Sequence, residues 1–118
     1  MDGKGSILEK AEAFALRIVK LYQYLVEKGE RVMSKQVLRS GTSIGANITE
    51  GYYGSSRADF INKYAIAEKE AAETRYWLNL LMKSGYLQED EATLSLVSDC
   101  SELIRLLASS IKTARKST

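Results

Sequence analysis

Histidine and proline are absent from the sequence, and cysteine occurs only once. Without histidine the chain lacks the commonest general base, the Ser-His and Cys-His nucleophile pairs and most zinc sites. Without proline it lacks the residue that most strongly interrupts helices. The lone cysteine, Cys100, excludes a disulfide within the chain and fits a reducing compartment. These absences favour an uninterrupted helical protein and argue against catalysis.

A strong charge of one sign and long apolar runs are also missing. The net charge is +2 and the isoelectric point is near 8.6, so no strong overall electrostatic field is expected. No apolar run approaches the roughly 20 residues that a membrane-spanning helix needs. The first residues lead into a charged amphipathic segment and not into a signal-peptide core. We expect a cytoplasmic protein without membrane contact, folded as one domain, 1–118.

Helical periodicity recurs along the chain. It predicts four helices, at residues 7–28, 35–53, 57–84 and 90–114. Ser6, Ser34 and Ser56 precede the first three helices as expected N-caps. Because short connections make successive helices antiparallel neighbours, the predicted fold is all-α, an up-down-up-down four-helix bundle.

The first and third helices carry more apolar residues than one buried face requires. The surplus residues are Leu8, Ala15, Val19, Tyr22 and Val26 in the first helix and Ile61, Ala65, Ala72 and Trp77 in the third. A helix in a monomeric bundle buries only about a third of its surface. Self-association would bury the remainder, so the pattern predicts a homo-oligomer. The alternative is a monomer with scattered apolar residues on its surface.

Residues 39–51 form the most unusual segment, because small and hydrogen-bonding residues crowd one side of the predicted helix. Two internal glycines, Gly41 and Gly45, each cost roughly 1 kcal/mol relative to alanine and indicate close backbone approach. We expect Arg39 to pair with Glu73 or Glu50, while its polar neighbours satisfy nearby backbone or carboxylate groups. The predicted structural cluster comprises Arg39, Ser43, Asn47, Glu50 and Glu73. In the alternative interpretation, Arg39 and Glu50 are simply solvated.

Metal and thiol chemistry find little support in the pattern. Glu68, Glu70 and Glu73 are the only dense carboxylate set, and Lys69 lies among them. A solvated, salt-bridged face is therefore favoured over a metal site. Cys100 falls on an apolar stripe, where a thiol behaves as a small hydrophobic group. We expect no catalytic residues, no metal and no cofactor.

Two stretches carry a family resemblance. The first contains Gln36, Arg39, Ser43-Ile44, Asn47-Ile48 and Glu50-Gly51; the second contains Phe60, Ala67, Lys69-Glu70-Ala71, Glu73-Thr74 and Tyr76-Trp77-Leu78. This pattern resembles a bacterial four-helix-bundle family, the ribosomal RNA intervening-sequence proteins. The matches span about residues 36–81, and Gly41 departs from the alanine that family members more often carry.

The resemblance implies a four-helix bundle that assembles as a homo-oligomeric ring, typically a homopentamer, and implies no enzyme activity. A related protein, the accessory variability determinant of diversity-generating retroelements, is a basic pentameric bundle that works with a reverse transcriptase and nucleic acid. By that analogy alone, RNA or DNA becomes a plausible partner. The present chain is less basic than such a role would ideally require.

Basic residues offer a second line of argument for nucleic acid. After Glu102 the chain contains four cations and no acid, and further cations surround the second helix. The candidate contacts are Arg31, Lys35, Arg57, Arg105, Lys112, Arg115 and Lys116, with Tyr52 and Tyr53 as stacking surfaces. Cations are also favoured at any helix C-terminus, so a structural explanation competes. The sequence thus predicts a non-enzymatic homo-oligomeric binding or scaffold protein, whose partner is RNA, DNA or an unidentified protein.

Overall fold

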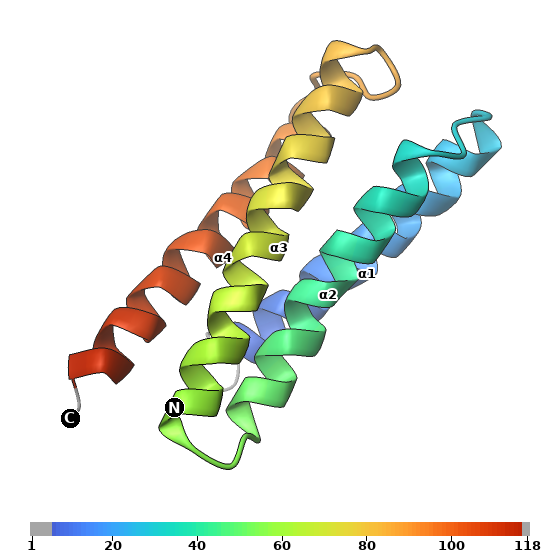
Figure 1. Cartoon of the computed structure of the whole chain (residues 1–118). Helices are drawn as coiled ribbons and strands as arrows, with labels where there is room; N and C mark the ends of the chain where they lie inside the picture. Colours follow the sequence, from blue (N-terminus) through green and yellow to red (C-terminus); the bar gives the residue numbers. More distant parts are fainter. Residues whose placement is uncertain (1–5, 117–118) are drawn as a thin grey trace.

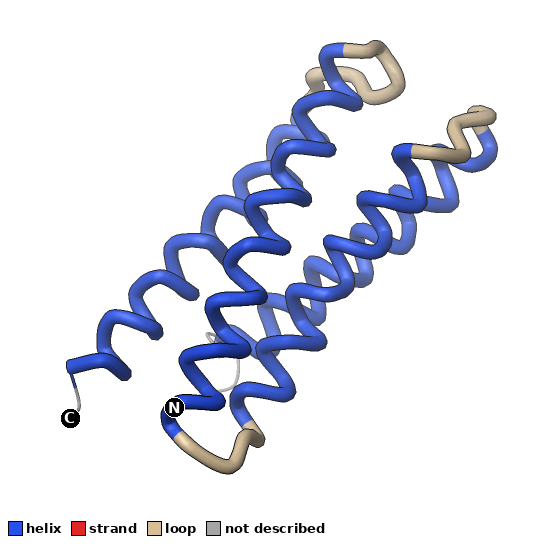
Figure 2. Tube along the Cα trace, in the orientation of Figure 1, coloured by secondary structure: helices blue, strands red, loops and turns tan. Residues whose placement is uncertain are grey.

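The computed structural model describes residues 6–116, which form four helices and no strand. They are α1 (Ile7–Glu27), α2 (Met33–Tyr52), α3 (Arg57–Lys83) and α4 (Glu91–Lys116). Successive helices run antiparallel in a molecule measuring 49 × 24 × 21 Å (Figures 1 and 2). The predicted all-α fold of four packed helices is confirmed. No helix in residues 6–116 is long and apolar enough to cross a membrane.

Side-chain caps explain where three of the helices begin. Ser6 Oγ accepts a hydrogen bond from the Glu9 backbone N–H at 3.1 Å, and Ser56 Oγ accepts one from Asp59 at 3.0 Å. Both predicted caps are confirmed. Asp90 Oδ1 caps α4 by accepting from the Thr93 N–H at 2.9 Å. These bonds satisfy N–H groups that a helix leaves unpaired at its first turn.

The predicted start of α2 is wrong, because Ser34 is not its cap. The helix begins at Met33, and Ser34 is a fully buried residue of the first turn. The carboxylate of Glu30 instead accepts from the N–H groups of Val32, Met33 and Ser34, at 3.2, 3.0 and 2.6 Å. Burial alone would raise the pKa of Glu30, but the backbone hydrogen bonds outweigh it and hold the pKa below its ordinary value. One carboxylate thus satisfies three N–H groups at the start of α2.

Two helical hairpins make up the molecule, one from α1 and α2 and the other from α3 and α4 (Figure 1). Extensive packing of α2 on α3 joins them, whereas α1 and α4 make the least extensive contact. Arg17 bridges that seam by donating to Asp99 Oδ2 at 2.7 Å and to the Ala92 carbonyl at 3.1 Å. The core between the hairpins is apolar, with Phe14 and Tyr64 among its largest buried side chains.

Candidate interaction surfaces

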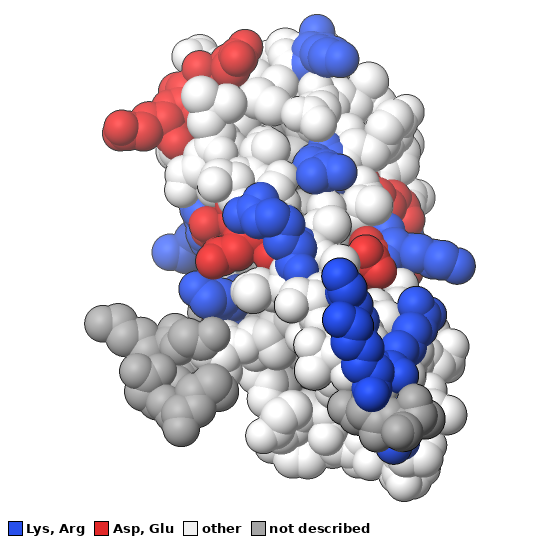
Figure 3. Space-filling model, turned by 90° about the vertical axis from the view of Figure 1, so that its left-hand side faces the viewer, with Lys and Arg blue, Asp and Glu red and all other residues white. Residues whose placement is uncertain are grey.

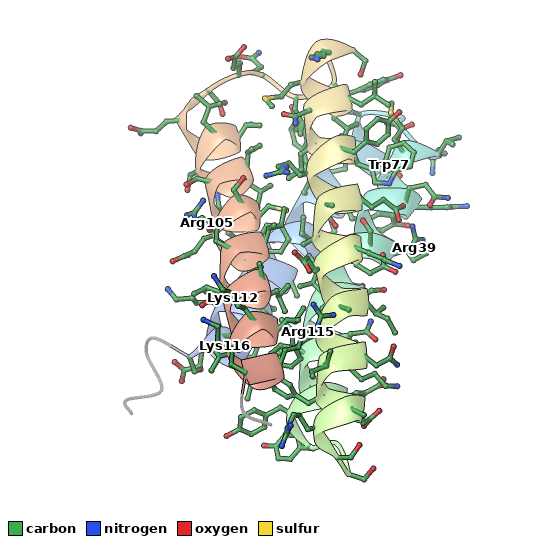
Figure 4. All side chains as sticks on the ribbon, turned by 60° about the vertical axis from the view of Figure 1, so that its left-hand side comes forward. Arg39, Trp77, Arg105, Lys112, Arg115 and Lys116 are labelled. Atoms are coloured by element: carbon green, nitrogen blue, oxygen red, sulfur yellow. The ribbon has the colours of Figure 1, made fainter. Side chains whose placement is uncertain are left out.

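Arg39 forms the centre of a polar cluster between α2 and α3 (Figure 4). Its guanidinium donates to Glu70 Oε1 at 3.2 Å, to Glu73 Oε2 and, less directly, to Gln36 Oε1 at 3.4 Å. Trp77 Nε1 donates to the same Glu73 oxygen at 2.9 Å. The arginine side chain is 47% exposed, so water screens these pairs and their contribution to stability is small.

The remaining residues of the predicted cluster lie apart from Arg39's carboxylates. Ser43 Oγ donates to the Arg39 carbonyl at 2.6 Å, and Asn47 Nδ2 donates to the Ser43 carbonyl at 2.9 Å. Glu50 pairs with Lys63 of α3 at 3.0 Å. Of the two partners expected for Arg39, Glu73 makes the contact, and Glu50 is bonded elsewhere. The two ion-pair sites therefore lie along the α2–α3 junction without forming one network.

A buried hydroxyl pair that sequence reasoning missed joins the same two helices. The hydroxyls of Ser40 and Thr74 lie 2.8 Å apart, and both side chains are fully buried. Thr74 Oγ1 also lies 2.8 Å from the Glu70 carbonyl, to which it donates. Ser40 is one of the small, hydrogen-bonding residues of segment 39–51, but periodicity alone could not show that this residue faces inward. A buried, satisfied hydroxyl pair fixes the register of α2 on α3.

The three glutamates of α3 do not gather around a common point. Glu70 and Glu73 both contact Arg39, whereas Glu68 lines a hollow between α3 and α4. Among the described residues, no group of three His, Cys, Asp or Glu side chains could hold a metal ion. Cys100 is buried, with its thiol 3.2 Å from the Ala71 carbonyl, and burial raises its pKa to about 12. These side chains serve the fold.

The basic residues of α4 surround the hollow on the outer face of the α3–α4 hairpin, which we call the α3/α4 face. The hollow has a volume of about 370 Å³ and is lined by Glu68, Ala108, Ile111, Lys112, Arg115 and Lys116. Figure 4 shows Lys112, Arg115 and Lys116 on the last turns of α4, with Arg105 nearer the middle of the helix. In Figure 3, Lys and Arg side chains are spread along this face, and those at the lower right lie close together. After Glu102, the described part of α4 carries these four cations and no acidic residue.

The other candidate nucleic-acid contacts are not all near this hollow. Arg31 and Lys35 lie at the end of the molecule where α2 begins, whereas Arg57 and the end of α4 lie at the opposite end (Figure 1). Tyr52 and Tyr53 are exposed at the α2–α3 corner, with ring centroids 5.0 Å apart. Tyr53 lines a small hollow together with Glu9 and Glu12, which repel phosphate. The predicted contacts therefore do not form one continuous basic surface.

The opposite side of the molecule, the α1/α2 face, carries an open groove. The groove has a volume of about 450 Å³ and is lined by Leu8, Ala11, Glu12, Ala15, Thr42, Gly45, Ala46, Thr49 and Glu50. Small residues of α2 form one wall, because Gly45 and Ala46 project little beyond the backbone. A Cβ atom on Gly45 would lie 3.5 Å from the Ala11 Cβ, an ordinary packing distance. The only ionisable residues lining the groove are acidic.

The surplus apolar residues lie on these two faces. On α1, Leu8 and Ala15 line the groove, and Val19, Tyr22 and Val26 continue their stripe at helical spacing. On α3, Ile61, Ala65 and Ala72 share a stripe with Glu68, which lines the α3/α4 hollow. None of these surplus residues is fully buried, although Leu8, Ile61 and Ala65 pack against the edge of the core. Trp77 differs, because it bonds to Glu73 beside α2.

Comparison with known proteins places the chain among proteins of the same fold. The family model described as "23S rRNA-intervening sequence protein" matches residues 4–109. The structure is also similar to the crystal structure of a protein of unknown function from the S23 ribosomal protein family of Bacteroides thetaiotaomicron. The two share 55% identity with a TM-score of 0.88, over 91% of this chain and 99% of that one. No match was found among curated proteins.

Proposed function

The chain belongs to the 23S rRNA-intervening sequence protein family, and we propose that it acts by association, as a non-enzymatic homo-oligomeric scaffold in the cytoplasm. The observation that carries the proposal is the surplus of apolar side chains on the α1/α2 and α3/α4 faces. Apolar surface gains about 25 cal/mol for each Å² removed from water, so contact between copies is favourable. The ring of five protomers, expected from the family resemblance, is the assembly we propose.

The absence of histidine from the chain and the burial of its one thiol support a role in binding. A scaffold presents the remaining surface to another protein, and the exposed Arg39 cluster is suited to that role. Arginine, tyrosine and tryptophan are enriched at protein interfaces, and Tyr76 is exposed beside Trp77, with their ring centroids 5.1 Å apart. The partner is therefore proposed to be a protein.

Light scattering after gel filtration tests the proposal directly. We expect the purified protein to elute as one species whose mass is a fixed multiple of one chain, five for the proposed ring. The multiple should persist in 1 M salt, because apolar contacts are screened little. A mass equal to one chain at high protein concentration would overturn the proposal.

A second candidate function, RNA or DNA binding, is favoured by one observation. Lys112, Arg115 and Lys116 line a single hollow on the α3/α4 face, and each is exposed to some degree at the surface. In an assembly that leaves the hollow open, repetition would multiply this local positive charge. Nucleic-acid binding of this type should weaken steeply with salt and should fall when Lys112 and Lys116 are replaced by glutamine. Equal binding by this variant and the wild type would remove the hollow as the site.

A further inference from the structure

The two faces that carry the surplus apolar residues lie on opposite sides of the molecule. The groove is on the outside of the α1–α2 hairpin, and the basic hollow is on the outside of the α3–α4 hairpin. Both lie toward the same end of the long axis, where α1 and α3 begin and α2 and α4 end (Figure 1). Two copies placed side by side with their axes parallel therefore bring the groove of one level with the hollow of the other.

The charges of the two faces are complementary. Glu12 and Glu50 are the ionisable residues that line the groove, and Glu50 is paired with Lys63 of α3. Lys112, Arg115 and Lys116 line the hollow, where Glu68 is the single acid. Two copies of the groove face would repel one another, and so would two copies of the basic hollow. Opposite charges attract only when the groove of one copy meets the hollow of another.

The shapes of the two faces favour the same arrangement. The groove wall of Gly45 and Ala46 allows a helix to approach closely. On the other face, Ala108 of α4 is exposed beside the hollow, and Ala65 and Ala72 lie along α3. Small side chains on both faces permit short distances between helix axes, which bury the neighbouring apolar residues. The two faces are thus suited to each other in shape as well as in charge.

We propose that the α1/α2 face of one protomer binds the α3/α4 face of the next, in a head-to-tail interface between copies of this chain. The inference rests on the proposed homo-oligomeric function and specifies the contact that produces it. Because each protomer offers two different faces, the interface is heterologous, and repeated contacts close into a ring when the rotation between copies allows it.

Two charge-introducing variants test the interface, one for each face. Ala46→Arg places a cation in the acidic groove that must receive a basic face, and Ala108→Glu places an acid beside the basic hollow. Both alanines are exposed, so each variant is expected to fold, as circular dichroism would check. We expect each variant alone to lose the wild-type assembly and to elute as a monomer. Ala13→Arg, at an exposed position of α1 outside both faces, is the matched control and should assemble normally.

Mixing the two variants distinguishes a head-to-tail contact from a symmetric one. Ala46→Arg retains an intact α3/α4 face, and Ala108→Glu retains an intact α1/α2 face. Their equimolar mixture should therefore regain association through the intact pair of faces, giving a species with at least twice the mass of one chain. A mixture that stays monomeric, or a wild-type mass for either variant alone, would overturn the proposed interface. A monomeric wild type would instead overturn the proposed homo-oligomer itself.

The proposed interface also competes with nucleic acid for the same residues. A protomer that covers the hollow of its neighbour hides Lys112, Arg115 and Lys116 in the assembled protein. We therefore expect the assembled wild type to bind a labelled single-stranded RNA at least tenfold more weakly than monomeric Ala46→Arg does. Equal or stronger binding by the assembled protein would show that the hollow remains open, contrary to the proposal.

Discussion

At the scale of single residues, exposure decides what the polar cluster contributes. Arg39→Ala removes ion pairs that water already screens, and we expect the free energy of unfolding to fall by only about 0.5–1 kcal/mol. Asn47→Leu should have a smaller effect, because Asn47 bonds only to a carbonyl of its own helix. Urea denaturation at neutral pH measures both variants. If Asn47→Leu lowered the free energy of unfolding more than Arg39→Ala does, this prediction would be wrong.

Glu30 illustrates the opposite case, a carboxylate that is only 6% exposed and holds three backbone N–H groups. Glu30→Gln should lower the free energy of unfolding at pH 7 by about 1–2 kcal/mol, as the loss of a strong helix cap does. The native pKa lies below the ordinary 4.5, so the ionised carboxylate stabilises the native state. This stabilisation is complete above the unfolded-state pKa and is lost as the pH falls through the native value.

Denaturation of wild type and Glu30→Gln across a pH series measures this linkage. The gap between their unfolding free energies should be widest near neutral pH and should narrow on acidification, because the amide does not titrate. Comparison at matched protein concentration keeps any assembly effect equal. A gap that is constant between neutral and acidic pH would show that the charge of Glu30 contributes nothing.

At the scale of the helix, α2 contains two glycines whose surroundings differ. A Cβ on Gly41 would lie 2.8 Å from Ile18 Cγ2, and Ile18 is fully buried. Gly41→Ala should therefore destabilise the fold by about 1–3 kcal/mol through overpacking. A Cβ on Gly45 would make only ordinary van der Waals contact with Ala11, so Gly45→Ala should stabilise the helix by up to about 1 kcal/mol.

Thermal denaturation of the two alanine variants in parallel tests this difference, since the substitution and the helix are the same. We expect the melting temperature to fall for Gly41→Ala and to be unchanged or higher for Gly45→Ala. Similar shifts for both variants would mean that Ile18 moves aside easily. The prediction for Gly45→Ala applies to the protomer and is best measured in the monomeric Ala46→Arg background.

The elements were largely predictable from the sequence, because apolar periodicity and serine caps act locally. The predicted helix boundaries agree with the structure to within about two residues. The start of α2 was missed because its cap, Glu30, lies in the preceding loop and accepts hydrogen bonds from three later N–H groups. Periodicity also groups residues on one side of a helix without revealing the neighbour that side meets. Ser40 and Asn47 therefore looked alike, although only Ser40 is buried.

At the scale of the whole molecule, surplus apolar stripes were visible in the sequence, but their placement on opposite faces was not. That placement depends on how the two hairpins pack, which is a property of the fold. The cations illustrate the same limit, because Arg31 and Arg57 seemed equivalent in the sequence and lie at opposite ends of the molecule (Figure 1). The homopentameric ring remains a prediction.

A protein stabilised by contacts between copies must become more stable as its concentration rises, since association removes folded protomers from the unfolding equilibrium. We expect the melting temperature of the wild type to rise by a few °C for each tenfold increase in concentration, as about 1 kcal/mol does for a domain of this size. Ala46→Arg should melt at one temperature throughout the series, and Ala13→Arg should follow the wild type. Scanning calorimetry at several concentrations measures all three. The melting temperature of the wild type could instead be independent of concentration and equal to that of Ala46→Arg. In that case the apolar faces would contribute no stability through contacts between copies.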